Sequence, residues 1–597
     1  MSRPDDEVLG KAYDARLMTR LWGVTRPHKR LVILSLVLFP LTAGVELVGP
    51  YLVKLAIDHH ILVGDWVGLT GMAVLFLITL VALYLLRVAQ AYVTQLTGQR
   101  VMHDLRHALF AHLQRLDAAF FDRNPVGRLM TRVLTDAEAI NEMFTSGMVS
   151  IVGDVVTLTG VVVVLLLLNW KLALVTFALV PLLAVAAAYF RIKARDCYRV
   201  VRVRLAALSA FLQESIQGVS VIQLFARERQ EAVAFAGLNG ALRAGQFRST
   251  LYDASLYAIV EAMGSAAVAL LLWYGGGEVL AGALTFGGLV AFIEYTSRFF
   301  LPIRDLGAKY AVMQAAMVSA ERVFALLDTP PAVVGGGHAG GARRPASAAV
   351  EFRDVTFAYP GGPPVLRECT FRIGPTERVA LVGPTGEGKT TVARLMTRTY
   401  DVTAGQVLVD GVDVREWDVR ALRRHVGLVP QEPFLFTGTI RENLVLGRDG
   451  GNDGGGDGSG ALEAALARAQ AARLVAGLPG GLDAVVRERG VNLSQGQRQL
   501  LAIARALIYN PRVLALDEAT SSVDAESETL IRAAVAELLQ DRASLIIAHR
   551  LSTIQSADRI LVLHHGRVRE AGRHAELLAA GGIYARLYEM QFGREPA

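Results

Sequence analysis

Residues 383–390 read Gly-Pro-Thr-Gly-Glu-Gly-Lys-Thr, a spacing of residue types that suits the binding of phosphate groups. Glycines let backbone N–H groups and a helix start surround phosphate oxygens, Lys389 adds positive charge, and Thr390 offers its hydroxyl to Mg²⁺. A chance glycine-rich turn is the alternative, but the sequence predicts a strand at Arg378–Val382 and a helix at Thr391–Thr397. This context favours a phosphate loop formed by Gly383, Pro384, Thr385, Gly386, Glu387, Gly388, Lys389 and Thr390, followed by Thr391.

A second feature is the apolar run Val513–Leu516, which ends in the acidic pair Asp517 and Glu518. On its own, an acidic strand end is usually a helix cap or a solvated turn. Beside a phosphate loop, Asp517 is expected to hold Mg²⁺ and Glu518 to polarise the water that attacks the terminal phosphate. The two motifs together predict a site that hydrolyses a nucleotide.

Both motifs lie in the second half of the chain, where charge and glycine are mixed as in a soluble α/β domain. Residues 349–597 are assigned to this domain, with its first strand at Ala349–Phe357. Residues 329–348 are rich in glycine, proline and alanine, which predicts a linker. Residues 449–460 are of low complexity and are predicted to be a flexible surface insertion.

The first half is of a different kind. The chain of 597 residues is 52% apolar with a mean hydropathy of +0.37, and the apolar excess is confined to this half. A helix of about 20 apolar residues crosses a bilayer core. The predicted fold is therefore a membrane bundle of six helices in residues 1–328, followed by the α/β domain. The expected spans are residues 31–53, 67–86, 148–169, 172–190, 254–277 and 279–296.

Basic residues predict the orientation. Arg26, Lys29 and Arg30 precede the first span, which places the N-terminus in the cytoplasm. The long Arg-rich connections at 87–147 and 191–253 are assigned to the same side, and six spans return the C-terminus there. The net charge of +6 is attributed to loops near anionic lipid, because no aromatic and basic interleaving indicates nucleic-acid binding. Cys197 and Cys369 give neither a disulfide framework nor a metal-ligand spacing.

Further motifs carry a resemblance to a known family. Leu493-Ser-Gln-Gly-Gln497 precedes Asp517 by about 20 residues and resembles the signature of the ABC ATPases. In the membrane half, residues 120–128 (FFDRNPVGR) resemble the first coupling segment of the bacterial multidrug and lipid exporters. The other elements occur in the family's order: Tyr359 in FAYP, Gln431 in VPQEPFLF, Asp524 after the acidic pair, and His549 in IIAHR.

The resemblance covers nearly the whole chain and implies roles for individual residues. Tyr359 would stack on the adenine of ATP, and His549 would contact the γ-phosphate. Gln431 would reach Mg²⁺ and the attacking water, so that Thr390, Gln431 and Asp517 hold the ion. The implied catalytic residues are Glu518, His549 and Gln431.

The same resemblance implies that the protein works as a pair. The signature residues would face the nucleotide held by a second half-transporter, Asp524 would stabilise the interface, and Glu488 in RERG would relay its state to the coupling helices. The signature residues are Leu493, Ser494, Gln495, Gly496 and Gln497.

One position departs from the family pattern, since Gln495 stands where the family consensus has glycine. Some exporters pair two different chains, of which one keeps the catalytic glutamate beside an altered signature. This chain keeps Glu518 and resembles that subunit, so a heterodimer is favoured. A homodimer that tolerates Gln495 is the alternative.

Four acidic residues fall within the expected spans, and ionisable groups there are candidates for function. Glu261 and Glu294 lie on the fifth and sixth spans, which line the cavity in the resembling exporters, and could contact a cationic substrate. The alternative is hydration at a cavity end or pairing with neighbouring helices. The same alternatives apply to Glu46 and Asp154.

The sequence therefore predicts an ATP-hydrolysing exporter of lipophilic or amphipathic drugs or lipids, in a bacterial cell membrane. Six spans exclude a soluble ABC-type module. An ATP-gated channel or regulator would be expected to carry a large regulatory insertion, and none is found. An importer built on the exporter fold stays open, and the substrate is not identified.

Overall fold

The computed structural model describes residues 14–337, 348–446, 459–517, 524–548 and 551–593. Contacts divide the chain into two compact units. One unit combines residues 1–113 with residues 127–329, and the other combines residues 114–126 with residues 330–597. The short segment 114–126 therefore groups with the C-terminal part of the chain, although it lies within the N-terminal half of the sequence.

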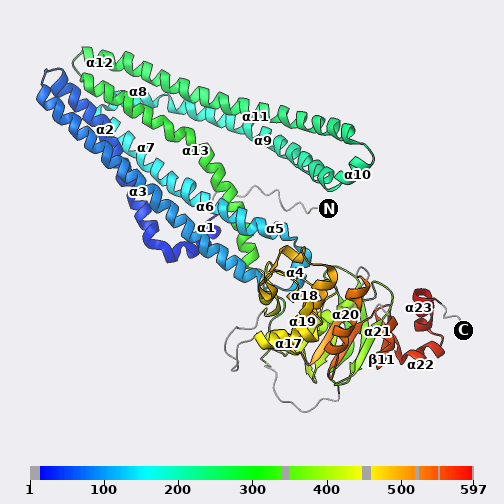
Figure 1. The fold of residues 1–597 in the computed structure, drawn as a ribbon. Helices are drawn as coiled ribbons and strands as arrows, with labels where there is room; N and C mark the ends of the chain where they lie inside the picture. The colour runs from blue at the N-terminus through cyan, green and yellow to red at the C-terminus, as the bar shows by residue number, and fades with distance from the viewer. Residues whose placement is uncertain (1–13, 338–347, 447–458, 518–523, 549–550, 594–597) are drawn as a thin grey trace. The chain divides into compact units, whose positions relative to one another are not determined.

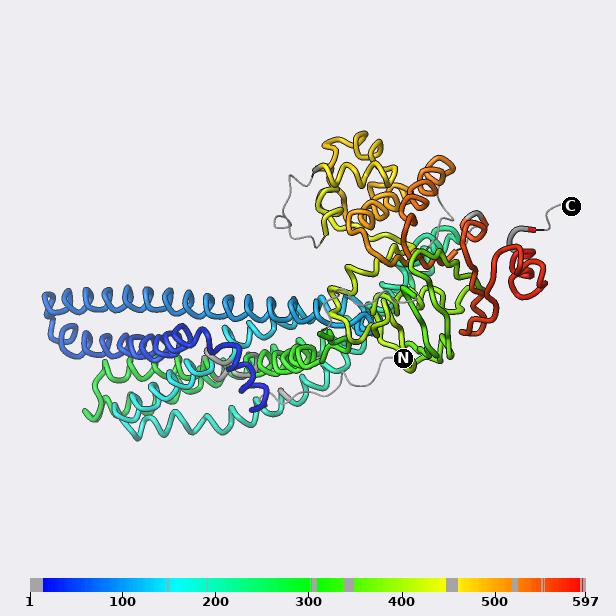
Figure 2. The backbone as a smooth tube through the Cα atoms, turned by 90° about the horizontal axis from the view of Figure 1, so that it is seen from below, coloured from blue at the N-terminus to red at the C-terminus, as the bar shows by residue number. Residues whose placement is uncertain are grey.

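Long helices build the first unit, and Figures 1 and 2 show them running alongside one another. Long apolar stretches in these helices suit a membrane, since every backbone polar group of a helix is satisfied within the helix. The long helices are α2 (Lys29–Ala56), α3 (Trp66–Leu113), α7 (Val149–Leu168), α9 (Val180–Gln217), α11 (Glu228–Leu270) and α13 (Phe286–Leu327). The shorter ones are α1 (Ala15–Thr25), α5 (Val126–Thr131), α6 (Ala137–Glu142), α8 (Trp170–Phe177), α10 (Val219–Leu224) and α12 (Gly276–Leu280).

Within the described residues, six helical stretches are long and apolar enough to cross a membrane. Four of them contain the expected spans 31–53, 67–86, 172–190 and 254–277, and a fifth contains the span 148–169 except for Asn169. The sixth is found in α13, of which Lys309–Leu327 qualifies among the described residues, and the same helix includes residues 286–296 of the expected sixth span. That expected segment contains the turn between α12 and α13, in which Thr285 caps the new helix by accepting a hydrogen bond from Gly288 N. The last long helix therefore begins at Phe286, later than expected.

The connection at Asn169 shows how closely two of these helices follow each other. The Asn169 side chain accepts hydrogen bonds from the backbone N–H groups of Lys171 and Leu172, and so caps α8 directly after α7 ends. Inside the unit, an apolar cluster that includes Val161, Phe292 and Tyr295 is buried. On the outside, apolar side chains such as Leu167, which is 81% exposed, match a lipid-facing surface.

The second unit is built on two main sheets. An antiparallel sheet has the order β2-β1-β4-β5, and a six-stranded sheet has the order β12-β11-β3-β10-β9-β6. In the latter, β11, β3, β10, β9 and β6 run parallel, and only β12 is antiparallel to its neighbour. The strands are β1 (Val350–Ala358), β2 (Pro364–Ile373), β3 (Arg378–Val382), β4 (Ala404–Val409), β5 (Val412–Asp413), β6 (Val426–Val429), β7 (Gly438–Thr439), β8 (Val485–Val486), β9 (Val513–Asp517), β10 (Ala543–Ile547), β11 (Arg559–His564) and β12 (Arg567–Gly572).

Two buried apolar clusters hold this unit together. One fills the space between the two sheets and includes Phe352, Leu381 and Leu545. The other packs the opposite face of the six-stranded sheet against α19 and its neighbours, and includes Leu500 and Ile546. The helices are α14 (Lys389–Met396), α15 (Val419–His425), α16 (Ile440–Leu444), α17 (Ser459–Arg468), α18 (Ala472–Ala476), α19 (Gln495–Tyr509), α20 (Ala525–Leu538), α21 (Leu551–Gln555), α22 (His574–Ala579) and α23 (Ile583–Phe592).

Helix α4 (Ala118–Arg123) belongs to the second unit and carries part of the expected coupling segment. Ala118 and Ala119 pack against the cluster between the sheets, and Phe120 is buried. Asp117 also accepts a hydrogen bond from the backbone N–H of Ala332, at 3.4 Å. Apolar packing and this polar contact together fasten α4 to the α/β unit.

Two expected segments fall largely outside the described residues. They are residues 338–347 of the linker and residues 449–458 of the surface insertion. In the part of the linker that is described, the backbone N–H of Gly336 donates to the carbonyl of Trp417 at 2.9 Å.

Candidate functional site

The phosphate loop joins β3 to α14, as the strand–loop–helix context predicts. Gly383 has a φ of +156°, and a Cβ added there would lie 2.3 Å from the carbonyl oxygen of Leu563. Gly388 has a φ of +98°, a left-handed conformation that side chains rarely adopt. The loop therefore requires glycine at both ends, and its backbone can approach a phosphate closely.

Lys389 begins α14 and is buried, at 6% exposure. Its ammonium group donates hydrogen bonds to the carbonyl oxygens of Gly383 and Pro384, both at 2.8 Å. Burial lowers the pKa of Lys389, and the nearby carboxylates of Asp517 and Glu387 counteract part of this effect. The positive charge thus lies inside the loop, where phosphate oxygens would replace the two carbonyls.

Thr390 and Asp517 come together from different parts of the chain. The Thr390 hydroxyl donates to Asp517 Oδ2 at 2.9 Å, and Asp517 lies at the end of β9 with only 5% exposure. Two oxygen ligands of an octahedral Mg²⁺, each about 2.1 Å from the ion, are about 3 Å apart. The observed separation fits such a pair, so these two residues can hold the ion.

The other expected residues of the site follow parallel strands. Because β3, β6, β9 and β10 are parallel, their carboxyl ends lie along one edge of the sheet. Gln431 follows β6 at this edge and is exposed. The positions of Glu518, after β9, and His549, after β10, fall outside the described residues.

Tyr359 lies in the turn after β1 and is half-buried. Its hydroxyl is 3.0 Å from the Thr391 hydroxyl, just behind the phosphate loop. Its ring makes edge-to-face contacts with Phe357 and Tyr400, at centroid distances of 4.9 and 5.3 Å. These contacts fix the ring beside the loop, which is compatible with stacking on a base.

The signature residues occupy the N-terminus of α19. Ser494 Oγ accepts a hydrogen bond from the backbone N–H of Gln497, and Gln497 Oε1 accepts one from that of Ser494. This reciprocal arrangement is a capping box. Gln495 is the first residue of the helix and is half-buried, Gly496 and Leu493 are buried, and Ser494 is exposed. The positive end of the helix dipole is therefore presented at an exposed position, which suits an anionic ligand.

Asp524 is the N-cap of α20. Its Oδ2 accepts a hydrogen bond from Ser527 N at 2.9 Å, and this bond holds the pKa of Asp524 below its ordinary value. The carboxylate is therefore charged and fixed in direction.

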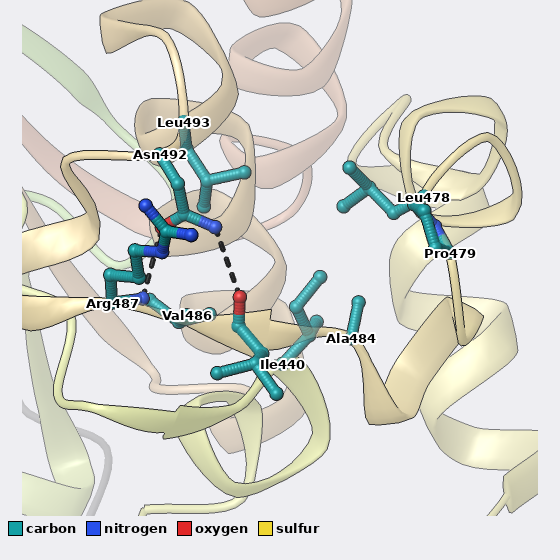
Figure 3. Close-up of a pocket in the computed structure, with 9 residues that line it drawn as sticks. Ile440, Leu478, Pro479, Ala484, Val486, Arg487, Asn492 and Leu493 are labelled. Atoms are coloured by element: carbon teal, nitrogen blue, oxygen red, sulfur yellow. Dashed lines mark hydrogen bonds between the residues drawn. The ribbon is translucent and has the colours of Figure 1, made fainter.

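A cavity of about 450 Å³ lies beside the signature (Figure 3). Asn492 bridges its floor, since it donates to the carbonyl of Val485 at 3.0 Å and accepts from the backbone N–H of Arg487 at 2.9 Å. Leu478 and Pro479 face these residues from the other side. Arg487, which lines the cavity, directly precedes Glu488, the residue for which the family resemblance implies a relay role.

Comparison with known proteins identifies the family. The family model described as the ABC transporter transmembrane region matches residues 32–303, and the model described as ABC transporter matches residues 366–521. The protein YknV of Bacillus subtilis, an ABC transporter ATP-binding protein, is 35% identical over 98% of this chain and 96% of its own length. The chain belongs to the ABC transporter family. It has the membrane and ATPase parts of an exporter half-transporter, and the ATPase part binds and hydrolyses ATP to drive transport.

Other relatives of this ABC transporter carry more specific names. An ATP-dependent lipid A-core flippase of Thiobacillus denitrificans is 36% identical over 97% of this chain and 99% of its own length. The protein YgaD of Bacillus subtilis, whose name provisionally assigns it to multidrug export, is 34% identical over 96% of this chain and 99% of its own length. A multi-pass membrane location follows from the family and from the six apolar helices.

In the transporter, three of the four acids that fall within the expected spans have basic partners. Glu46 Oε1 lies 3.0 Å from Arg87, and Asp154 forms an ion pair with Lys309. Glu294 lies 3.9 Å from Arg298, one helical turn away. For Glu261, by contrast, the described part of the chain provides neither an ion pair nor a hydrogen bond, and the residue is exposed.

Two sets of contacts near the ATP site could not be predicted from the sequence. His564 and His565 face Glu387 of the phosphate loop, and the only signal for them is the adjacent histidine pair itself. Tyr400, which contacts Tyr359, also donates its hydroxyl to Asp122 of α4. Neither contact joins residues that are close in sequence.

Proposed function

We propose that this ABC transporter exports lipophilic or amphipathic compounds, drugs or lipids, by alternating access. The observation that carries the proposal is the attachment of α4 to the ATPase unit beside the aromatic residues of the expected adenine site. Tyr400 contacts Tyr359 on one side and donates to Asp122 on the other. A change at the nucleotide can therefore be passed to a segment that leads directly into the long helices.

In the proposed cycle, two ATPase domains close over bound ATP and the coupling segments move the membrane helices outward. Hydrolysis that depends on Glu518 then resets the transporter. The energy source is the higher affinity of nucleotide for the closed state.

The proposed roles of the site residues follow the family resemblance and the geometry. Lys389 and the loop backbone bind the phosphates, Tyr359 stacks on adenine, and His549 contacts the γ-phosphate. The residues proposed to hold Mg²⁺ are Thr390, Asp517 and Gln431.

We further infer three segments: a membrane domain at residues 1–328, a linker at 329–348 and a nucleotide-binding domain at 349–597. The contacts of α4 support a functional link between the first and the last of these.

The active form is proposed to be a dimer in which each site combines one chain's phosphate loop with the other chain's signature. The exposed N-terminus of α19 supports this, because it faces no phosphate loop of its own unit among the contacts described. Gln495 favours a heterodimer, since it replaces the glycine of the family consensus beside a retained Glu518.

Substrate contact is proposed for Glu261 and Glu294. Glu261 supports the idea more strongly, because Glu294 has Arg298 as a neighbour. The names of the relatives support lipids and drugs as substrate classes. The proposed location is the bacterial cell membrane with both termini in the cytoplasm.

The first test is ATP hydrolysis by this chain alone, purified in lipid nanodiscs, with Glu518→Gln as the blank. Activity that appears only after co-expression with a second half-transporter supports the heterodimer. Robust Glu518-dependent hydrolysis by a dimer of this chain contradicts it and establishes a homodimer in which Gln495 supports catalysis.

Transport direction needs a separate experiment. Inverted vesicles that carry the active transporter are expected to accumulate a lipophilic dye when ATP is added outside. ATP-dependent loss of preloaded dye from the same vesicles would instead indicate import. Glu261→Gln and Glu294→Gln should reduce uptake of cationic dyes, whereas unchanged uptake would remove these residues from the substrate site.

A further inference from the structure

A two-residue hairpin turn brings a pair of histidines to the phosphate loop. Strand β11 ends at His564, and His565 and Gly566 form the turn into β12, with φ angles of +51° and +72°. The backbone N–H of Gly566 donates to Glu387 Oε2 at 3.2 Å, and the backbone N–H of Arg367 donates to the Gly566 carbonyl at 2.9 Å. The turn is thus held in place against Glu387 by backbone contacts.

Both imidazole rings offer the same atom to the same carboxylate oxygen. Glu387 Oε1 lies 3.3 Å from His564 Nδ1 and 4.0 Å from His565 Nδ1. The three ligand atoms all lie within 4.8 Å of one another. A tetrahedral ion with bonds of about 2.1 Å holds its ligands about 3.4 Å apart. Side-chain movements of less than about 1 Å would therefore close the observed set around one ion.

The surroundings distinguish this cluster from an ordinary surface ion pair. Glu387 is largely enclosed, with 14% of its side chain exposed, and His564 is half-buried. His564 Nδ1 is inaccessible to solvent and has no hydrogen-bond partner within the described part of the chain. An enclosed polar nitrogen that lies 3.3 Å from a carboxylate oxygen without a hydrogen bond is costly to bury, and a bound cation would satisfy both atoms.

The ligand types indicate which cation. Two imidazole nitrogens and one carboxylate oxygen suit Zn²⁺ and its neighbours among the transition metals, whereas Mg²⁺ and Ca²⁺ prefer oxygen ligands alone. This set also differs from the proposed Mg²⁺ ligands at Thr390 and Asp517. We propose that Glu387, His564 and His565 bind a divalent ion of the zinc class at the edge of the phosphate loop.

Such an ion would act on the loop in two ways. It would join the loop to the β11–β12 hairpin, and it would neutralise a carboxylate that otherwise repels the phosphates of ATP. The proposal concerns ion binding and does not depend on the transport function.

The test measures Zn²⁺ binding to the tag-free full-length chain in nanodiscs, by competition with a chromophoric zinc chelator. His565→Asn removes one ligand, and asparagine tolerates the left-handed turn position. We expect this variant to lose one bound Zn²⁺ per chain, or to bind it at least about tenfold more weakly because one of three protein ligands is gone. Glu387→Gln should weaken Zn²⁺ binding in the same assay.

His59→Asn is the matched control, since His59 is an exposed histidine beside His60 and remote in sequence from the turn. It should keep the wild-type stoichiometry. Zn²⁺ should also raise the melting temperature of the wild type and of His59→Asn, but not that of His565→Asn. Equal Zn²⁺ binding by wild type and His565→Asn, or absence of micromolar binding by the wild type, would overturn the proposal.

Discussion

Asp517 illustrates how one buried carboxylate serves two purposes. Its Oδ2 accepts the Thr390 hydrogen bond, which aligns the loop, and its charge is available to a cation. Asparagine can keep the first role but not the second, because an amide oxygen accepts a hydrogen bond without carrying a charge.

Asp517→Asn is therefore expected to lower ATP hydrolysis by about 100-fold or more, since charge stabilisation of the transition state is lost. Binding of a fluorescent ATP analogue in the presence of EDTA should change less than about threefold, because the phosphate loop stays intact. Hydrolysis within fivefold of the wild type would show that Asp517 is not needed for Mg²⁺.

The two cysteines should differ sharply in reactivity. Cys369 is fully buried, and burial raises the pKa of its thiol to about 12, whereas Cys197 is half-exposed. The reactive form is the thiolate, so burial and the raised pKa together keep Cys369 unreactive near pH 8. N-ethylmaleimide at pH 8 should add one label to the native protein and two after denaturation, as measured by intact mass.

Cys197→Ser provides the control for this prediction. It should show no label in the native state and one label after denaturation. Two labels on the native wild type would mean that the core between the sheets opens readily.

For single residues, the sequence predicts the position of those that belong to one contiguous motif. The phosphate loop lies between its predicted strand and helix, and Asp517 reaches Thr390. The partners of Glu387 could not be predicted, because they depend on the register between β3 and β11, two strands separated by much of the domain's sequence.

Among the elements, α4 is the one whose contacts bear most directly on coupling between ATP hydrolysis and transport. Phe120 is buried, Ala118 and Ala119 pack on the core, and Asp122 accepts the hydroxyl of Tyr400. Burial and the hydrogen bond to Asp122 raise the pKa of Tyr400, which keeps its hydroxyl protonated as a donor. This is the polar link between α4 and the aromatic cluster at the expected adenine site.

Tyr400→Phe removes that link and keeps the ring. We expect basal ATP hydrolysis within about twofold of the wild type, while substrate-stimulated hydrolysis and vesicle uptake fall several-fold, since one hydrogen bond to a carboxylate contributes about 1.5–3 kcal/mol. Asp122→Asn, which can still accept the hydrogen bond, should have the smaller effect. Full transport by Tyr400→Phe would place the coupling elsewhere.

The boundaries of elements were harder to predict than their existence. The sequence places α14 at Thr391, whereas it begins at Lys389, because Gly388 and not a side chain supplies the cap position. The last membrane helix begins at Phe286, because the apolar residues that precede it form a turn capped by Thr285. Hydropathy alone cannot predict such a turn, because the residues that form it are as apolar as those of the helix.

In the membrane domain, an acid that forms an ion pair with a basic residue on another helix is expected to stabilise the packing of the two helices. Lys309 on α13 and Asp154 on α7 form an ion pair, with 19% and 21% of their side chains exposed. The sequence identified Asp154 as unusual but could not supply its partner, since Lys309 lies far along the chain.

Lys309→Met should destabilise the protein by about 2–3 kcal/mol, because it leaves a carboxylate without its counter-charge among apolar helices. The double variant Asp154→Asn, Lys309→Met should recover most of this loss, because no uncompensated charge is left. Melting temperatures in nanodiscs give the comparison. Additive losses in the double variant would show that the pair contributes nothing through its charge.

The hydrogen bonds of Lys389 also bear on how the protein is made. Because the amine already has two carbonyl partners within its own loop, the buried charge of Lys389 is satisfied without a bound phosphate. We expect a newly synthesised chain to complete this domain before any nucleotide arrives. A cell that is briefly starved of energy should then accumulate dormant transporters ready to resume work, and not damaged chains that must be degraded.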